Sequence, residues 1–144
     1  MSADKFESPC IYFNLRKATR LMGQIYDRHF RQVGLKGTQY SLLMAIDRLG
    51  GPNIGDLSQA LGLEQSTVTR NIELLIRNAF VEARPEPNDN RIKVLILTRA
   101  GKKKIKEALP FWQAAQADLI GRLGEKDSDR LIRMHNRLIA VLKQ

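Results

Sequence analysis

The segment between Gln65 and Asn71 concentrates side chains of the kind with which proteins bind nucleic acid. Its hydroxyl, amide and guanidinium groups belong to Gln65, Ser66, Thr67, Thr69, Arg70 and Asn71. Such groups form hydrogen bonds with base edges and with phosphate oxygens. Val68 and Ile72, about one helical turn apart, supply an apolar face on the opposite side. The spacing therefore predicts a helix whose outer face fits a DNA groove.

The residues before this segment complete a helix-turn-helix pattern. We expect a short helix from Ile54 to about Ala60, followed by a turn at Gly62. Its inward face is formed by Leu57, Ala60 and Leu61. The second helix of such a pair enters the major groove with its N-terminal end, whose positive dipole also favours phosphate. Two short helices joined by glycine also occur in proteins that bind no DNA, so the flanking segments must support this interpretation.

A change of hydrophobic period after this motif predicts a β-hairpin. Residues 80–84 and 92–97 are rich in β-branched and apolar side chains, which is typical of strands. Between them, residues 85–90 form the turn-prone cluster Pro-Glu-Pro-Asn-Asp-Asn. We expect this cluster to be a flexible tip that is too long for a two-residue hairpin turn.

Charged side chains near this tip are suited to a second contact with DNA. Arg91 is the natural side chain to enter a narrow minor groove, where negative potential is concentrated. We expect Arg84 and Lys93 to contribute to the same contact. Asp89 is acidic in a basic surrounding, and two roles are open for it: it holds Arg91 in place, or it closes an Asx-turn.

The charge distribution favours a polyanionic partner. The chain has 144 residues, enough for one domain, with 24 Lys and Arg against 15 Asp and Glu and a net charge of +9. The segment 84–106 holds eight basic and two acidic residues, and the segment 14–36 holds six basic residues and one acidic residue. Neutralising phosphates with such segments releases counterions, which favours DNA. A plain solvated surface is the alternative.

Catalysis and metal binding are not expected. The sequence has no Gly-x-Ser-x-Gly, Walker or dinucleotide-binding motif. Its two histidines, His29 and His135, are isolated, so neither a hydrolytic triad nor a metal site with protein ligands is predicted. We therefore expect no enzyme activity, no catalytic residue, no metal and no cofactor.

Membrane insertion and secretion are not expected either. The longest apolar run, residues 94–97, has four residues, whereas a membrane span needs roughly twenty. Residues 1–7 lack the apolar stretch of a secretory signal. A single cysteine forms no internal disulfide and suits a reducing compartment. We expect a cytoplasmic protein that associates with the nucleoid.

Helical periodicity predicts two helices before the motif. The first apolar stripe consists of Ile11, Leu15, Ala18, Met22 and Ile25. It indicates a helix over residues 11–33, which Gly34 ends. We expect a second helix over residues 38–49, with Thr38 as its N-cap. Thr38 and Gln39, at the start of this helix, are candidates for contacts with DNA phosphates.

Two further helices are predicted after the hairpin. Thr98 is expected to cap a long helix that reaches about Arg122 and is kinked at Pro110. A last helix is expected to begin at a cap formed by Asp127 or Ser128. Its stripe consists of Leu131, His135, Leu138 and Leu142. The predicted fold is mainly α with a small β-hairpin, in the order α-α-α-α-β-β-α-α.

Together these motifs resemble the MarR (multiple antibiotic resistance regulator) family of winged helix-turn-helix regulators, over nearly the whole chain. The resemblance is carried by residues 13–20 (FNLRKATR), 65–70 (QSTVTR), 89–91 (DNR) and 97–101 (LTRAG). The third segment is similar to the family's Asp-x-Arg signature at the hairpin tip, and the fourth to its Leu-Thr-x-x-Gly junction between strand and helix. Asn90 departs from the pattern, because many members carry a second basic residue there.

The resemblance implies an obligate homodimer on a palindromic operator, often with relief of repression by a small phenolic or other aromatic ligand or by oxidation. We expect a single domain over residues 1–144. Residues 37–101 would form the winged helix-turn-helix DNA-binding lobe, and residues 1–36 and 102–144 the dimerisation helices. The terminal helices carry more apolar face than a small lobe can cover, and pairing two chains removes that face from water. The alternative is that these helices fold back on their own domain.

Five residues are candidates for a sensor or a ligand pocket, namely Cys10, Tyr12, Phe13, Tyr26 and Tyr40. Cys10 resembles the single N-terminal cysteine of hydroperoxide-sensing relatives, and a small, idle cysteine is the alternative. Tyr12, Phe13 and Tyr40 would line a pocket between the dimerisation helices and the lobe. Trp112 is expected to serve packing rather than ligand binding.

The sequence thus predicts a DNA-binding transcriptional regulator, a homodimeric repressor of a palindromic operator that a small aromatic ligand or an oxidant relieves. The alternative is a sequence-tolerant architectural DNA-binding protein without an effector response. A regulator should prefer its operator to random DNA by about 10³-fold or more, which separates the two functions.

Overall fold

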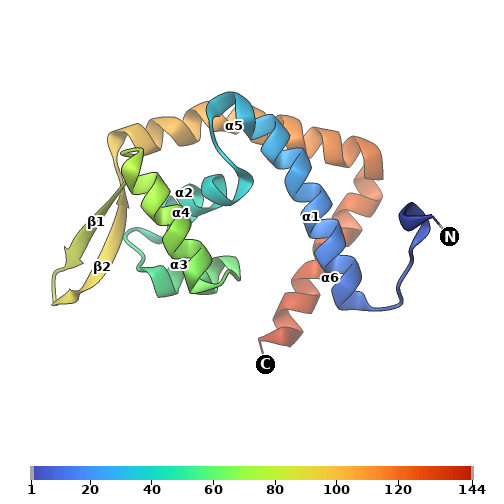
Figure 1. Cartoon of the computed structure of the whole chain (residues 1–144), viewed down its shortest axis with the longest axis horizontal. Helices are drawn as coiled ribbons and strands as arrows, with labels where there is room; N and C mark the ends of the chain where they lie inside the picture. Colours follow the sequence, from blue (N-terminus) through green and yellow to red (C-terminus); the bar gives the residue numbers. More distant parts are fainter. Residues whose placement is uncertain (1, 144) are drawn as a thin grey trace.

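The structure is a computed structural model that describes residues 2–143, and it is mostly helical (Figure 1). Its elements are η1 (Ala3–Lys5), α1 (Ile11–Phe30), η2 (Arg31–Val33), α2 (Gly37–Leu49), α3 (Ile54–Leu61), α4 (Gln65–Arg77), β1 (Val81–Glu86), β2 (Asp89–Leu97), α5 (Arg99–Leu123) and α6 (Glu125–Leu142). Apart from the two short 3₁₀ turns, this is the predicted order. The prediction of a mainly α fold with one small hairpin is confirmed.

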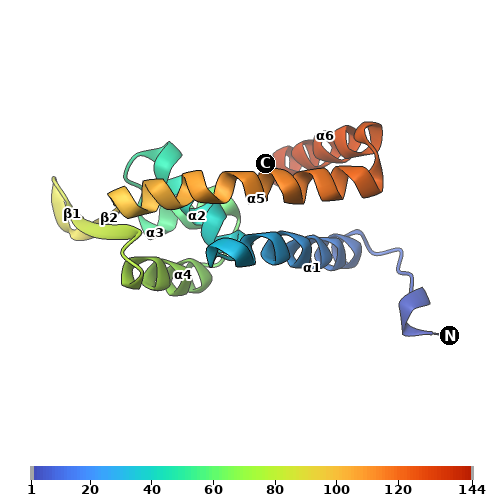
Figure 2. The ribbon, with the colours of Figure 1, turned by 90° about the horizontal axis from the view of Figure 1, so that it is seen from above.

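The long helix α5 joins the two halves of the molecule. Its N-terminal half lies over a lobe made of α2, α3, α4 and the hairpin, and its C-terminal half leads to α6 (Figure 1). Seen from above, α1 lies on one side of α5 and α6 on the other (Figure 2). The helix continues through Pro110 without a break. Pro110 supplies no N–H to the carbonyl oxygen of Lys106, and both residues are exposed, so water can bind this oxygen.

The lobe is organised around apolar side chains from each of its helices. Leu42 of α2, Leu57 of α3 and Val68 of α4 are all fully buried. Gly62, between α3 and α4, has a φ of +63°, the left-handed conformation that glycine adopts without strain. The turn that the sequence predicts at this glycine is therefore confirmed, and α3 and α4 form a helix-turn-helix.

The hairpin is attached to this lobe at its base. The backbone N–H of Leu95 donates to the carbonyl oxygen of Pro52, between α2 and α3, at 2.8 Å. The N–H of Thr98 donates to the carbonyl oxygen of Phe80 at 3.1 Å. Leu95 is also buried in the core. The base of the hairpin thus moves with the helix-turn-helix, while its tip extends away from the lobe (Figure 1).

The hairpin tip is shorter than the sequence predicts. The strands extend to Glu86 and Asp89, which pair with each other, so only residues 87–88 turn the chain. The expectation of a long flexible tip is wrong. Pro85 pairs with Lys93 inside the ladder, because in a two-stranded sheet one side of each strand has no neighbour and a missing N–H is tolerated there.

The start of α2 differs from the prediction. The helix begins at Gly37 with Lys36 at the N-cap, so Thr38 lies within the first turn and does not cap it. The cause is a contact from another helix, since the carboxylate of Asp27 in α1 accepts the N–H of Gly37 at 2.7 Å. Asp27, ten residues earlier in the sequence, thus accepts an N–H at the start of α2, where we expected Thr38 to act as the cap.

The start of α6 differs as well. The helix begins at Glu125, directly after Gly124, so neither Asp127 nor Ser128 caps it. Gly124 has a φ of +90° and separates α5 from α6 with a single residue. The hydroxyl of Ser128 instead donates to the carbonyl oxygen of Gly124 at 2.7 Å inside the first turn.

The junction between β2 and α5 follows the prediction. Thr98 caps α5, and its hydroxyl oxygen accepts the N–H of Gly101 at 3.0 Å. Gly101 is buried against the backbone of Phe80, where an added Cβ would lie 2.1 Å from the carbonyl oxygen. Only glycine allows α5 to approach the start of β1 this closely.

Replacing Gly101 with alanine should therefore lower the free energy of unfolding by about 1–3 kcal/mol, since the backbone must shift to relieve the overlap. Urea unfolding followed by circular dichroism measures this loss. Gly121→Ala is the matched control on the same helix, because no atom lies within 4 Å of its added Cβ. The control should be neutral or stabilising, as alanine favours helix; equal losses at both positions would contradict the packing argument.

Candidate DNA-binding surface

The outer face of α4 is an open polar surface. Val68 and Ile72 are buried on its inner side, which holds the helix against the lobe. The predicted contact residues on the outer side are Gln65, Ser66, Thr69 and Arg70, which are exposed, and Thr67 and Asn71, which are partly exposed. The structure thus brings all six onto the side of α4 that is not packed in the core.

The start of α4 leaves its first N–H groups open to an anionic ligand. Glu64, at the N-cap, makes no capping hydrogen bond with its side chain, so no local side chain competes for the first N–H groups of the helix. About two turns after Glu64, Asn71 donates from its amide to the carbonyl oxygen of Thr67 at 2.9 Å. This bond orients the amide of Asn71, so its oxygen can accept from a donor on a base edge.

Arg91 is held at the hairpin tip by Asp89. Its Nε donates to Oδ1 at 3.1 Å and its Nη2 to Oδ2 at 3.3 Å, while its backbone N–H donates to Oδ1 at 3.0 Å. The side-chain bond, and then the backbone bond, lower the pKa of Asp89. The backbone bond is an Asx-turn, so the two roles left open for Asp89 occur together. The Arg91 side chain is still 90% exposed.

The hairpin register explains why Arg91 projects. Pairing shifts between Pro85 and Glu86, so Asn90, Arg91 and Ile92 bulge from β2 without partners in β1. Bulges re-aim side chains and are frequent next to functional sites. The tip therefore presents an exposed guanidinium whose orientation is favoured by its two bonds to Asp89.

The other two predicted cations of the hairpin lie along the strands. Arg84 is exposed and donates from Nη2 to Oε2 of Glu82 at 2.9 Å. An exposed pair of this kind contributes little stability, so a phosphate can replace Glu82 as the partner. Lys93 is exposed on β2.

The start of α2 presents the two predicted phosphate contacts. Thr38 is exposed and Gln39 is partly exposed. The amide oxygen of Gln39 accepts the N–H of Lys36 at 3.0 Å. This bond leaves Nε2 of Gln39 as the group that can donate to an anion.

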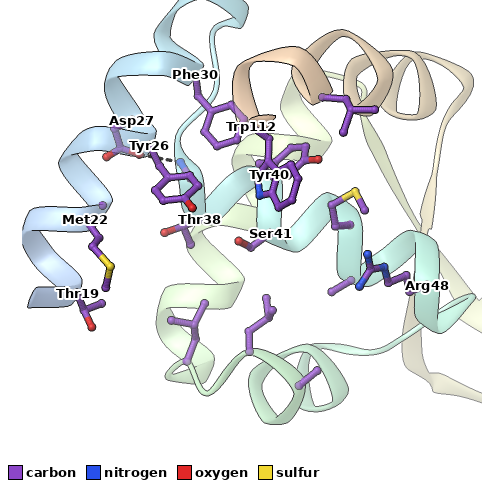
Figure 3. Close-up of a pocket in the computed structure, with 18 of the residues that line it drawn as sticks. Thr19, Met22, Tyr26, Asp27, Phe30, Thr38, Tyr40, Ser41, Arg48 and Trp112 are labelled. Atoms are coloured by element: carbon purple, nitrogen blue, oxygen red, sulfur yellow. Dashed lines mark hydrogen bonds between the residues drawn. The ribbon is translucent and has the colours of Figure 1, made fainter. Parts of the chain in front are cut away.

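A cleft of about 940 Å³ lies between α1, α2, α3 and α5 (Figure 3). The rings of Tyr26, Tyr40 and Trp112 gather in one part of it, and Arg48 stands apart from them on α2 (Figure 3). Burial raises the pKa of both tyrosines. Two predicted pocket residues, Tyr26 and Tyr40, therefore line this cleft. Trp112, expected to serve packing rather than ligand binding, packs against the core and also lines the cleft.

The other three candidates for a sensor or pocket lie outside this cleft, at the start of α1. Cys10 is exposed at the N-cap, where its Sγ accepts the N–H of Phe13 at 3.5 Å. The ring of Tyr12 stacks with the guanidinium of Arg16 at 5.4 Å. The expected grouping of Tyr12 and Phe13 with Tyr40 does not occur within one chain, because α1 carries them away from the lobe.

The described part of the chain shows neither of two other kinds of site. Within residues 2–143 no helix has the length and apolar character to cross a membrane. Over the same residues, no cluster of three or more His, Cys, Asp and Glu side chains is arranged to hold a metal ion.

Comparison with known proteins places this geometry in a family. The model of the MarR family matches residues 33–92, which span α2, α3, α4, β1 and the tip of the hairpin. The transcriptional regulator MosR of M. tuberculosis, in a crystal structure with DNA, is 32% identical, with a TM-score of 0.81 over 93% of this chain and 96% of that one. The chain belongs to the MarR family.

Two more relatives agree with this assignment. The uncharacterised HTH-type transcriptional regulator YwoH of Bacillus subtilis is 25% identical over 115 residues, which cover 80% of this chain and 83% of YwoH. BpsR of Bordetella bronchiseptica, whose DNA binding is regulated by 6-hydroxynicotinic acid, shares the fold with a TM-score of 0.82 at 22% identity, over 92% of this chain and 95% of BpsR. This MarR-family chain is a DNA-binding transcriptional regulator with a winged helix-turn-helix, a class of regulators and not of enzymes. The hairpin β1–β2 is its wing.

Alanine at Arg91 should weaken DNA binding of this MarR-family regulator about tenfold, with little change in sequence preference, because a wing arginine responds to groove potential more than to base identity. Fluorescence anisotropy with a specific and a random duplex measures both effects. Arg99→Ala removes the same charge from an exposed residue at the base of the wing and should cost less. Unchanged affinity in Arg91→Ala would exclude the wing tip from the interface.

Proposed function

We propose that the protein is a homodimeric repressor of a palindromic operator, and that a small aromatic ligand bound in the cleft releases it from DNA. In this proposal residues 37–101 form the DNA-binding lobe, and residues 1–36 and 102–144 form the dimerisation helices. The protein acts in the cytoplasm, at the nucleoid.

The observation that carries the DNA-binding part is the exposed polar face of α4 together with the exposed Arg91 of the wing. A recognition helix in the major groove and a wing in the adjacent minor groove use these two features at once. Thr38 and Gln39 at the start of α2 add contacts with phosphates. The DNA complex of MosR, at 32% identity, supports this assignment.

The dimer is supported by apolar surface that the single chain leaves exposed. On α6, only Ser128 is buried. The exposed large apolar side chains of the terminal helices include Ile11, Tyr12, Leu123, Ile132, Met134, Ile139, Val141 and Leu142. Large apolar side chains exposed in this number on the terminal helices mark an interaction surface rather than an ordinary solvated one. A second copy covers it and places two recognition helices about 34 Å apart, as a palindrome requires.

The ligand-response part is supported by the chemistry of the cleft. Its walls combine aromatic rings with the hydroxyls of Thr19, Thr38 and Ser41, a combination that suits a flat ring with polar substituents. The cleft lies between α1, which belongs to the dimerisation region, and α2, which starts the lobe. A ligand that prefers one arrangement of these helices shifts the population away from the DNA-binding form. The regulation of BpsR by 6-hydroxynicotinic acid, an aromatic acid, supports this choice of ligand class.

Oxidation of Cys10 is the second candidate signal. The thiol is exposed at the start of α1, so an oxidant reaches it. Mild peroxide treatment with thiol trapping tests this signal. Unchanged DNA binding after Cys10 has been oxidised would exclude redox control and leave the aromatic ligand.

Footprinting on the intergenic DNA beside the protein's own gene tests the proposal. The expected result is a symmetric protected site, preferred to random duplex by about 10³-fold or more at equal salt. Aromatic carboxylates and phenols added to this complex should then release it. Tight binding without preference would favour the architectural alternative, and the absence of any binding would exclude both functions.

A further inference from the structure

The junction between α1 and α2 is closed by a hydrogen bond that links two helices. Oδ1 of Asp27, in the last turns of α1, accepts the N–H of Gly37, the first residue of α2, at 2.7 Å. Asp27 is partly buried, and the contact lies in the wall of the cleft (Figure 3). The bond spans ten residues, across η2 and the loop that follows it.

Nothing within α2 replaces this bond. Lys36, at its N-cap, forms no capping bond with its side chain, and the first turn contains no acidic residue. Gln39 is already committed through its amide oxygen to the N–H of Lys36. Asp27 is therefore the carboxylate at the positive end of α2, supplied by a neighbouring helix.

On the α1 side of this hydrogen bond, the residues around Asp27 are held by contacts with α5. Tyr26, next to Asp27, donates from its hydroxyl to Gln116 of α5 at 2.5 Å. Nε2 of His29 lies 3.4 Å from Oδ2 of Asp118 on α5. These two contacts fix α1 against α5 close to Asp27. Through its bond to Gly37, Asp27 in turn fixes the start of α2.

We propose that Asp27 is a positioning residue for DNA binding, which fixes the first turn of α2 so that Thr38 and Gln39 meet the phosphate backbone. This inference rests on the proposed function, because it concerns the contacts assigned there to α2. Thr38 and Gln39 follow Gly37 directly, so any displacement of Gly37 moves both. Since Asp27, Gly37 and Thr38 all line the cleft, the bond also connects the proposed ligand site with a DNA contact.

The proposal and simple electrostatics predict opposite changes in DNA affinity when Asp27 is removed. A carboxylate near a phosphate contact repels DNA, so its removal would strengthen binding if charge alone mattered. If Asp27 acts by position, its removal weakens binding, and an uncharged acceptor in the same place preserves it. Asp27→Asn keeps an oxygen for the N–H of Gly37, whereas Asp27→Ala does not.

The test compares variants of Asp27 with variants of a control position on the footprinted intergenic duplex. Asp27→Ala should bind roughly five- to tenfold more weakly than the wild type, as expected for losing a charged hydrogen bond that holds a contact in place. Asp27→Asn should stay close to the wild type. Asp47→Ala, which removes the same charge from an exposed position on α2, should not weaken binding. Circular dichroism melting identifies any variant that fails to fold. If Asp27→Ala does not fold, Asp27→Asn is compared with Asp47→Asn: unchanged binding in Asp27→Asn supports the positioning role, and tighter binding in Asp27→Asn alone contradicts it.

Phosphate ethylation interference supplies a readout that a merely structural role would not move. In the wild type, ethylating the DNA phosphates that contact Thr38 and Gln39 should weaken binding. In Asp27→Ala this sensitivity should disappear, while sensitivity at the phosphates near α4 and the wing remains. In a Thr38→Val background, Asp27→Ala should cost less than in the wild type, because the contact that it positions is already lost.

The outcomes separate this inference from the proposed function. If the wild type binds the duplex but Asp27→Ala binds equally or more tightly, the positioning role is wrong and the proposed function stands. A uniform loss of sensitivity at every phosphate in folded Asp27→Ala would also overturn it. If the wild type binds no duplex, the proposed function fails and Asp27 has no DNA contact to position.

Discussion

Aspartate at both Ile132 and Ile139 should convert the protein into a monomer and lower its operator affinity by on the order of 10³-fold. The two side chains lie two turns apart on the same face of α6, and they are 57% and 50% exposed. The folded single chain can therefore carry carboxylates there at little cost. In a two-fold symmetric dimer, both protomers would place these carboxylates in the interface. The charges would be buried there without an opposite charge, which strongly opposes association.

The loss of affinity follows from the loss of linkage between two half-sites. A dimer binds its second half-site from an effective concentration set by its own geometry, whereas a monomer must bind each half-site from solution. Light scattering gives the mass, and anisotropy on the footprinted duplex gives the affinity. Ile76→Asp, a substitution at a 39% exposed position on α4, should leave the mass of the dimer unchanged. A double variant that is still dimeric would place the interface elsewhere, and a monomer with full affinity would show that one lobe suffices.

Local periodicity was enough to predict most of the fold. The helices, the glycine turn at Gly62 and the cap at Thr98 depend on neighbouring residues, so a single sequence contains the information needed. The errors occur where a distant partner replaces a local one. Thr38 is a good N-cap by type, but Asp27 already satisfies the first N–H of α2. Pro85 is a turn residue by type, but a two-stranded sheet leaves room for it beside Lys93.

The candidate site was predictable to a similar extent. The polar face of α4 follows from the spacing of Val68 and Ile72, and the pairing of Arg91 with Asp89 spans only two residues. The cleft depends on tertiary packing, and no periodic signal brings Trp112 and Tyr40 to the same cleft or the carboxylate of Asp27 beside Gly37. Trp112, two residues after Pro110 in a long helix, gives only a weak signal of the cleft, since an aromatic residue there is equally typical of a core.

Alanine at Arg70 should cost about 1–3 kcal/mol of operator binding for each half-site if its guanidinium reads a base. A dimer on a palindrome contains Arg70 twice, so the complete site should lose about twice that amount. The residue is exposed in the second turn of α4, and the packing of Val68 and Ile72 beneath it is unaffected by the change. The loss should therefore appear in binding and not in the free energy of unfolding.

The comparison between operator and random duplex assigns the role of Arg70. A base contact costs affinity only where the correct base is present, so the preference for the operator should fall; a phosphate contact costs the same on both duplexes. Arg77→Ala is the matched control, because it removes the same exposed side chain from the same helix, two turns further from the end that enters the groove. Its effect should be small on both duplexes. Equal losses on operator and random DNA in Arg70→Ala would make Arg70 a phosphate contact and leave base recognition to the amides and hydroxyls of the first turn of α4.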